Sequence, residues 1–392
     1  MRTQSSEVLV VGGGPAGAAA AAWAARAGRE VTLLDSEIFP RDKPCGDGLT
    51  PRAVKELGAL GLDSWLADKP RNLGLRAAGF GQELLLPWPG GSLPAHGSAV
   101  PRTELDARIL HVARESGATV HEGTAAVDVE MNGNHLAAVI AQQGDEHTAF
   151  RAQHVIVADG ARSQLGRKLG REWHRETAFG VAARGYIESD RSDDPWISSH
   201  LELRGPEGEV LSGYGWVFPL GGAQVNIGVG TLATATRPAE VNLKALLHQY
   251  TGLRRDDWQL RGEVRAPWSA ALPMGGAVSG VAGRNWMLIG DAAGCVNPLN
   301  GEGIDYGLET GRLAASLVGS ERNFAVAWPD QLRSHYGVAF SIARRLAGYL
   351  TVPGLLPALG PWGMRSRHLM TVALRVMGNL VTDEDSDLVA RL

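Results

Sequence analysis

The spacing of hydrophobic and polar residues begins with a pattern typical of a strand, a turn and a helix. Val8–Ala25 contains no charged residue, but four glycines and a proline interrupt it. These breaks argue against a membrane-spanning helix, and the lack of a basic head argues against a signal peptide. The run instead predicts a buried strand over Glu7–Val11 and an alanine-rich helix over Ala16–Ala27. A second apolar strand at Glu30–Asp35 completes a βαβ unit of a parallel sheet.

Hydrophobic and polar residues alternate from about Phe179 to Arg265, which predicts an antiparallel sheet. The α/β pattern returns with a strand at Trp286–Ile289 and a helix from near Gly303, so this sheet is expected to be an insertion. The proline-rich stretch Leu84–Ala95 is interpreted as a linker rather than a regular element. The alternating runs are Val181–Ile187, His200–Leu203, Tyr214–Phe218 and Gln224–Val229.

The expected fold class is therefore α/β, with a Rossmann-like domain, an inserted antiparallel β-sheet domain and a C-terminal helical segment. The Rossmann-like domain is discontinuous and takes residues 1–70, 99–175 and 268–330. The inserted domain, which would bind the substrate, takes residues 71–98 and 176–267. The helical segment takes residues 331–392.

Composition narrows the functional classes. The 392 residues are 44% hydrophobic and 20% charged, with a net charge of −4, so neither a disordered chain nor a nucleic-acid-binding protein is expected. The two cysteines, Cys45 and Cys295, exclude a disulfide scaffold and favour a reducing, cytoplasmic location. The eleven histidines show no ligand spacing, so no metal is expected.

A glycine fingerprint follows the first strand and opens the first helix. In Gly12-x-Gly14-x-x-Gly17, the first glycine permits a tight turn, the second admits a pyrophosphate and the third allows close helix–sheet packing. Asp35 ends the second strand, where a carboxylate binds ribose hydroxyls. A packing turn would explain the glycines alone, but strand, helix and acid together predict dinucleotide binding.

Two later segments place an acid and a glycine after a buried strand. Val157–Ser163 contains Asp159 and Gly160, and Leu288–Gly294 contains Gly290 and Asp291. With the glycine turn at 301–304, they resemble FAD enzymes of the p-hydroxybenzoate hydroxylase fold. Asp291 would also suit a helix N-cap. The FAD-binding positions that the resemblance implies are Gly12, Gly14, Ala16, Gly17, Asp35, Arg41, Cys45, Gly46, Gly48, Arg102, Ala126, Asp159, Gly160, Gly290, Asp291, Pro298, Gly301, Gly303 and Ile304.

Two further segments resemble the geranylgeranyl reductase family. They are the loop Lys43–Leu49, which in that family runs past the flavin, and the strand motif Tyr214-x-Trp216-x-Phe218-Pro219. Asp47 departs from the pattern, because many members of the family have glycine there. Alternate aromatic residues lie on one face of a strand, so Tyr214, Trp216 and Phe218 are expected to form an apolar wall that binds substrate. Taken alone, the three residues would also suit an ordinary sheet core.

The resemblance is strongest to family members that saturate one isoprene unit in the side chain of menaquinone. It implies hydride transfer from N5 of reduced FAD to an isoprenyl C=C bond, with Cys45 or Tyr214 as candidate catalytic residues that relay the proton. No second glycine fingerprint carries its own acid and helix. The electrons are therefore expected from a transient donor, NAD(P)H or a redox carrier.

Three alternatives remain open at this stage. A flavin monooxygenase or halogenase of the same fold would need a placed lysine, for which Lys69 is the candidate. A geranylgeranyl reductase acting on another prenyl lipid fits the same motifs, and so does a quinone carrier that holds FAD only structurally.

The C-terminal segment combines apolar stretches with basic residues. Between Gln331 and Thr382 there are six arginines and no acidic residue. This pattern is typical of docking on an anionic membrane surface, and a helical lid over the α/β domain fits it as well. A peripheral location on the inner face of the cell membrane is therefore expected.

Overall fold

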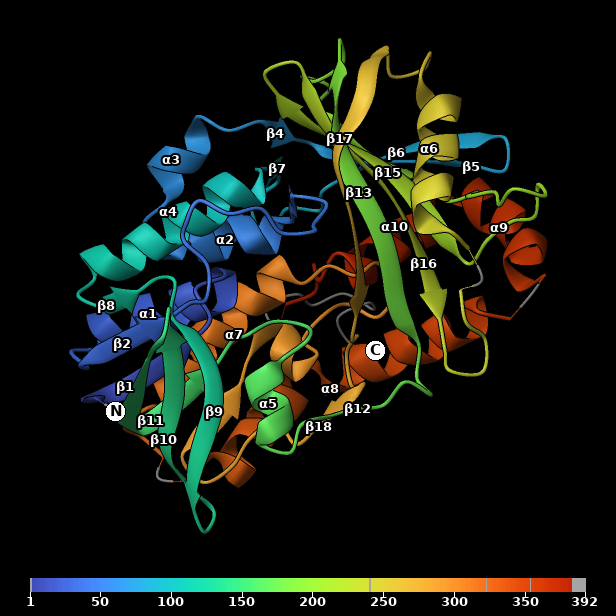
Figure 1. Ribbon diagram of the computed structural model, residues 1–392. Coiled ribbons are helices and arrows are strands. Elements are labelled where there is room, and N and C mark those ends of the chain that lie inside the picture. Colours follow the sequence, from blue (N-terminus) through green and yellow to red (C-terminus); the bar gives the residue numbers. More distant parts are fainter. Residues whose placement is uncertain (1, 240, 322, 353, 383–392) are drawn as a thin grey trace.

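The computed structural model describes residues 2–239, 241–321, 323–352 and 354–382, which form two large sheets with helices packed against them (Figure 1). The first sheet has seven strands in the order β8-β2-β1-β11-β10-β9, with β19 paired to β11. Its central pairs β1–β2, β1–β11 and β11–β19 are parallel. Its strands are β1 (Arg2–Val11), β2 (Val31–Leu34), β8 (Thr119–His121), β9 (Ala125–Asn132), β10 (His135–Gln143), β11 (Glu146–Val157) and β19 (Trp286–Leu288).

Helices cover both faces of this sheet because its central strands are apolar on both sides. Val8 and Val10 of β1 lie in one core with α1 (Pro15–Arg26), α4 (Arg102–Glu115) and α7 (Ile304–Leu317). Leu9 and Val11 of the same strand lie in a second core with Tyr336 of α8 (Phe324–Leu350). The expected first strand, helix and second strand are thus present, with β1 extended five residues further toward the N-terminus than expected.

The second sheet has seven strands in the order β17-β13-β16-β15-β14-β5-β6. All its pairs are antiparallel except β14–β5. One face packs against α6 (Leu243–Arg254), whose Tyr250 ring lies 2.3 Å from where a Cβ on Gly215 would stand. Its strands are β5 (Gly74–Gly79), β6 (Gln82–Pro87), β13 (Phe179–Ser189), β14 (Trp196–His200), β15 (Gly213–Gly221), β16 (Gln224–Ala233) and β17 (Leu260–Leu272).

Two expected elements are wrong. Leu84–Pro87 belongs to β6 and not to a linker, since an edge strand tolerates proline where no hydrogen bond to a neighbour is needed. Trp88 then continues into the core, where its indole nitrogen donates to Asn72 Oδ1 at 2.7 Å. The expected strand His200–Leu203 is also wrong, because β14 ends at His200.

The C-terminal part is helical. After α8 come α9 (Leu355–Arg365) and α10 (Arg367–Met377), and both pack against β6. Residues 383–392 of the expected segment lie outside the described residues. Among the helices described, none has both the length and the apolar character needed to cross a bilayer. The remaining elements are β3 (Gly48–Leu49), α2 (Pro51–Ala59), α3 (Asp63–Ala67), β4 (Arg71–Asn72), β7 (Gly97–Ala99), α5 (Gln164–Lys168), β12 (Glu172–Trp173), β18 (Val278–Ser279) and the 3₁₀ turn η1 (Gly290–Ala293).

Candidate active site

The glycine turn between β1 and α1 builds a cradle of backbone. Gly12 has φ +106°, and a Cβ there would stand 2.3 Å from the carbonyl oxygen of Ala158. A Cβ on Gly17 would stand 1.9 Å from the carbonyl oxygen of Gly12, so both positions require glycine. Gly14 differs, since within 4 Å of its added Cβ lies only the Arg41 guanidinium, at 3.7 Å. The turn therefore leaves open space at the N-terminus of α1, where an anion is stabilised.

Asp35 holds the other side of this turn. Its Oδ2 accepts a hydrogen bond from the Gly13 amide at 2.5 Å, and its Oδ1 accepts one from the Glu37 amide at 2.8 Å. The Asp35 carbonyl oxygen also accepts a hydrogen bond from the Thr124 amide at 2.7 Å, just before the strand that carries Ala126. The carboxylate is thus fixed beside the glycine turn, as a ribose-binding acid requires.

The two turns that pair an acid with a glycine, at Asp159–Gly160 and Gly290–Asp291, lie beside the cradle. Their two carboxylates have different contacts. Asp159 accepts hydrogen bonds from the Ser163 hydroxyl at 2.6 Å and the Leu165 amide at 2.9 Å, so it caps α5. Burial raises the pKa of the Asp159 carboxyl. Asp291 lies in η1 and faces α7, with its Oδ1 3.1 Å from where a Cβ on Gly303 would stand. Asp291, rather than Asp159, is therefore the acid at the entrance of α7.

Lys43 was missing from the expected site residues. Its Nζ lies 2.8 Å from where a Cβ on Gly160 would stand. Burial lowers the pKa of the Lys43 ammonium, while the nearby Asp291 carboxylate opposes that shift. Lys43 and Arg41 thus bring two cations to the cradle. The only signal in the sequence was a lysine within a Pro/Gly-rich loop after the second strand.

Arg102 and Arg41 share one buried carboxylate. Arg102 donates to both oxygens of Asp106, at 2.6 and 2.7 Å, and Arg41 donates to Asp106 Oδ2 at 2.5 Å. Arg102 also faces the Cys45 thiol. Burial raises the pKa of Cys45 to about 11, although Arg102 works against this shift. At neutral pH the Cys45 thiol is therefore protonated and is not a reactive thiolate.

The three aromatic residues of β15 share one face of the second sheet, opposite the face that packs on α6. Adjacent ring centroids lie 5.8 Å apart for Tyr214 and Trp216 and 6.3 Å apart for Trp216 and Phe218. The Phe218 ring lies 3.1 Å from where a Cβ on Gly46 or Gly48 would stand. The aromatic wall, defined as Tyr214, Trp216 and Phe218, thus meets the loop around Cys45.

The turn before α7 lies at the other end of the aromatic wall. The Tyr214 hydroxyl donates to the carbonyl oxygen of Asn300 at 2.6 Å. Glu302 Oε1 accepts the Ile304 amide at 3.0 Å and so caps α7. Burial raises the pKa of Glu302 and of Asp305, and repulsion between the two carboxylates raises the pKa of Glu302 further. Pro298 and Ile304 are buried and Gly301 has φ +74°, so these residues shape the turn.

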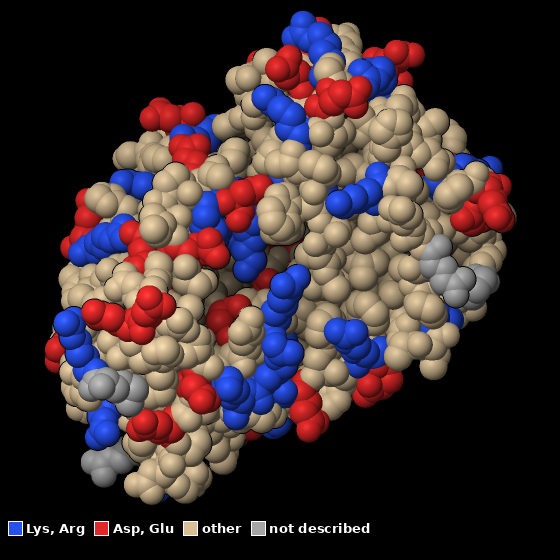
Figure 2. Space-filling view, in the orientation of Figure 1, with Lys and Arg blue, Asp and Glu red and all other residues tan. Residues whose placement is uncertain are grey.

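The residues present have the chemistry that an FAD molecule needs. Open backbone at Gly14 with Arg41 and Lys43 suits the diphosphate, Asp35 suits a ribose, and Asp291 with the turn before α7 suits the flavin half. Gly290 and Ala16 contribute by packing, since a Cβ on Gly290 would stand 3.0 Å from the Ala16 Cβ. Figure 2 shows a hollow between the two halves of the molecule, rimmed by acidic and basic side chains.

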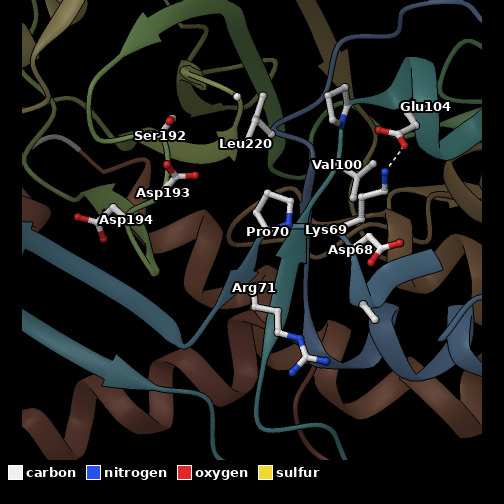
Figure 3. Close-up of a pocket in the computed structure, with 15 residues that line it drawn as sticks. Asp68, Lys69, Pro70, Arg71, Val100, Glu104, Ser192, Asp193, Asp194 and Leu220 are labelled. Atoms are coloured by element: carbon white, nitrogen blue, oxygen red, sulfur yellow. Dashed lines mark hydrogen bonds and ion pairs between the residues drawn. The ribbon is translucent and has the colours of Figure 1, made fainter. Parts of the chain in front are cut away.

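A separate pocket of about 500 Å³ lies between α3, the start of α4 and the turn that links β15 and β16 (Figure 3). Its lining places charged residues such as Asp68, Arg71 and Asp193 among apolar ones, which does not suit a prenyl chain. Lys69 also lines it, forming an ion pair with Glu104 and lying 5.0 Å from the centroid of Trp65. The lysine that a halogenase would need is therefore already paired.

Comparisons with known proteins agree with this geometry. A family model described as an FAD binding domain matches residues 5–318. The menaquinone reductase of Mycolicibacterium smegmatis is 63% identical over 390 residues, covering 99% of this chain and 95% of that protein. The expected resemblance to FAD enzymes that act on menaquinone is thereby confirmed.

Solved structures show the same fold at low identity. A geranylgeranyl bacteriochlorophyll reductase-like protein from Thermoplasma acidophilum has a TM-score of 0.76 at 20% identity, covering 95% of this chain and all of that one. A flavin-dependent brominase has a TM-score of 0.75 at 20% identity, covering 96% of this chain and 94% of that one. These matches confirm the expected α/β fold. Because the two score alike, the fold alone does not distinguish the two chemistries.

Proposed function

The chain belongs to the FAD binding domain family, and on that premise we propose that it is an FAD-dependent reductase of menaquinone. The reaction would saturate one isoprenyl C=C bond in the quinone side chain. The observation that carries the proposal is the 63% identity to a menaquinone reductase over nearly the whole of both chains. Another prenyl lipid is the nearest alternative substrate.

When bound, FAD supplies a two-electron centre that can deliver hydride to an alkene carbon. An isolated alkene has no carbonyl to polarise, so the protein acts mainly by placement and by excluding water. Tyr214, Trp216 and Phe218 would hold the prenyl chain flat. The proton for the second carbon would come through a group near the wall, with the Tyr214 hydroxyl and the Cys45 thiol both held protonated by burial, which raises their pKa values.

Mass spectrometry of quinones tests the proposal directly. Adding one hydride and one proton raises the mass of menaquinone by about two units. We expect this product in cells that make the protein and its absence in cells that lack the gene. Identical quinone masses in the two strains would rule out menaquinone as the substrate.

The role of the aromatic wall is tested by Trp216→Ala. Trp216 is buried, so its removal should lower prenyl reduction by about a hundredfold through lost positioning, while FAD stays bound. Trp268→Ala is the matched control, because Trp268 of β17 is 54% exposed. If Trp216→Ala turns over substrate as fast as the control, then the second sheet does not form part of the substrate site.

Oxygen dependence separates this function from halogenation or hydroxylation. Prenyl reduction consumes two electrons from the donor and two protons, delivered as one hydride and one proton, so turnover should continue without oxygen. The pairing of Lys69 with Glu104 supports reduction over halogenation. Oxygen uptake coupled to substrate would favour the monooxygenase alternative, and an FAD that no donor reduces in the presence of substrate would favour a structural carrier.

We further propose that the C-terminal helices dock on an anionic membrane. Val338, Ile342, Leu346 and Tyr349 follow helical spacing along α8 and are 41–65% exposed. Trp362 of α9 is also 71% exposed, and six arginines without an acid lie in the same segment. Each arginine near an anionic surface contributes about 1 kcal/mol. The location would be the inner face of the cell membrane.

Vesicle flotation tests the docking. The protein should bind vesicles containing anionic lipid more than neutral ones, and Trp362→Ala with Leu346→Ala should weaken binding while Trp268→Ala does not. Equal partition of all variants with both vesicles would favour the lid alternative. The proposal also includes the electron donor, which would be NAD(P)H or a redox carrier. It divides the chain into three parts: an FAD-binding domain of residues 1–70, 99–175 and 268–330, a substrate-binding domain of residues 71–98 and 176–267, and a helical segment of residues 331–392.

A further inference from the structure

Asp47 adopts a backbone conformation that glycine adopts more easily. Its φ is +64°, in the left-handed region, where aspartate and asparagine are tolerated better than most side chains. Its side chain is nonetheless fully buried, with 0% exposure. A strained backbone and a buried carboxyl at one position need a compensating interaction.

The Asp47 carboxyl finds that compensation on the second sheet. Its Oδ2 accepts a hydrogen bond from the Tyr186 hydroxyl at 2.8 Å and another from the Asn226 amide at 2.9 Å. Its Oδ1 is buried without a partner. Tyr186 lies on β13 and Asn226 on β16, so one carboxyl connects the loop to two adjacent strands.

Asn226 extends the connection to the aromatic wall. Its side-chain amide also donates to the Cys45 carbonyl oxygen at 2.8 Å, and its Oδ1 accepts the Trp216 indole N–H at 2.9 Å. A single side chain therefore bonds both ends of the Cys45–Asp47 segment and orients the central ring of the wall. A shift of Asp47 would move Cys45 and Trp216 together.

Arg184 fixes the beginning of the same loop. Its guanidinium donates to Asp42 Oδ1 at 2.5 Å and to the Lys43 carbonyl oxygen at 2.7 Å, and it lies 4.6 Å from the Tyr186 ring centroid. The Val100 amide holds the far end by donating to the Asp47 carbonyl oxygen at 2.9 Å. The loop, residues 42–48, is thus anchored near both ends, and the Asp47 carboxyl ties its second half to the second sheet.

We propose that Asp47 is the positioning residue that couples loop 42–48 to the aromatic wall, so that the reducing site is set by the charge of its carboxyl. The proposal rests on the proposed function, since it names a residue that tunes the same site. The anion accepts both hydrogen bonds strongly, and protonation weakens them. The tethered, active arrangement therefore belongs to the ionised form.

The charged and polar groups around Asp47 determine the pH at which its carboxyl ionises. Burial raises its pKa to about 6, while Asn226, Tyr186, Arg184 and Arg102 each favour the anion. The rate of prenyl reduction should therefore rise as pH increases through about 6. Two other titratable groups of the loop are shifted as well: burial lowers the pKa of Lys43, and the Cys45 thiol stays protonated over this range.

The test compares four holoproteins. Asp47→Gly suits the left-handed backbone and removes the tether, and Asp47→Asn keeps the shape without the charge. We expect both to retain FAD, to reduce menaquinone about tenfold more slowly at pH 7.5, and to lose the inflection near pH 6. Asp145→Asn, in the exposed turn between β10 and β11, is the control and should match wild type. Wild-type rate and pH profile in Asp47→Gly would overturn the proposal.

Tyr186→Phe keeps the proposal testable if the Asp47 variants fail to fold. It removes one hydrogen bond to the anion, so the inflection should move to higher pH by about one unit. No movement would contradict the coupling.

The reduction potential of bound FAD between pH 5 and 8 gives a readout that needs no quinone. A break near pH 6 in wild type, absent in Asp47→Asn, is expected. A break that persists in Asp47→Asn would overturn the proposal, whereas a wild-type protein that shows the break without reducing menaquinone would contradict only the proposed substrate.

Discussion

Asp291 illustrates how one carboxylate can decide whether a cofactor stays bound. It lies in the buried turn after β19, between the N-terminus of α7 and the Lys43 ammonium. We predict that Asp291→Ala purifies without colour, because the flavin half loses the acid that faces the start of α7. The measurement is the visible flavin absorbance per protein, which should fall below about a tenth of the wild-type value. The reason is that the variant loses a charge-assisted hydrogen bond and leaves the Lys43 ammonium without the opposing charge of Asp291, which costs several-fold to a hundredfold in affinity for FAD.

Asp330→Ala is the control for Asp291→Ala. Asp330 forms an exposed ion pair with Arg333 on α8, so its loss should leave flavin content unchanged. If Asp291→Ala retains as much flavin as wild type, then Asp291 does not contribute to the cofactor site.

Cys45 gives a prediction about pH. With a pKa of about 11, only about one thiol in a thousand is ionised at pH 8, and the thiolate is the reactive form. Alkylation by iodoacetamide should therefore be slow at pH 8 and rise about tenfold per pH unit up to pH 10. The measurement is the labelled fraction by mass spectrometry, with a cysteine peptide of pKa near 8.5 as the reference. A plateau below about pH 9 would mean that the thiol ionises more easily than its burial predicts, which would argue against Cys45 as the protonated group that relays a proton.

At the scale of elements, the site depends on how closely α1 and α7 approach each other. A Cβ on Gly311 of α7 would stand 2.5 Å from the Ala16 carbonyl oxygen and 3.0 Å from the Ala20 amide nitrogen. We predict that Gly311→Ala pushes the helices apart and lowers the free energy of unfolding by about 1–3 kcal/mol. Because both helices begin at the cofactor cradle, flavin content should fall with stability. Denaturant unfolding and flavin absorbance measure the two effects.

Gly348→Ala is the matched control in another helix. An added Cβ at Gly348 of α8 would meet nothing within 4 Å, so alanine should stabilise the protein by about 0.5–1 kcal/mol through helix propensity. If both alanines stabilise the protein, then the close packing of α1 on α7 is not a constraint.

The sequence could predict those elements that are determined by residues close together along the chain. The glycine turn and the strand before it follow from Gly12 and Gly17, whose neighbours in space are the turn itself and β11. The edge strand β6 could not be predicted, because its one proline, Pro87, is tolerated only by virtue of the strand's position at the end of the sheet.

The same distinction separates the predictable and unpredictable parts of the site. Asp35 and Asp291 stand at strand ends with recognisable spacing. The Asn226–Cys45 hydrogen bond instead joins residues 181 apart, and Lys43 and Glu302 enter the site only when the loop and α7 are brought together. No local pattern encodes such contacts, so only the tertiary structure could reveal them.

At the scale of the whole molecule, the end of α10 is bonded to the turn before α7. The Asn300 side-chain amide donates to the Met377 carbonyl oxygen at 2.8 Å, and the Asn297 amide donates to that of Val376 at 3.2 Å. Arg52 of α2 donates to the carbonyl oxygens of Asn379 and Val381, at 2.7 and 2.6 Å. The helices proposed to dock on the membrane are thereby linked to the turn that meets the aromatic wall.

Asn300 is the residue through which this link can be tested. Its Oδ1 accepts the Glu302 amide at 2.9 Å and its carbonyl accepts Tyr214, so it joins the C-terminal helices, the cap of α7 and the wall. We predict that Asn300→Ala raises hydrogen exchange in residues 376–382 by about fivefold, as expected when a net hydrogen bond of about 1 kcal/mol is lost. Flavin release should accelerate with it, whereas vesicle binding should not change. Asn242→Ala, which removes the cap of α6, controls for the loss of an amide elsewhere. Faster exchange at 376–382 without faster flavin release would mean that the C-terminal helices and the reducing site act independently.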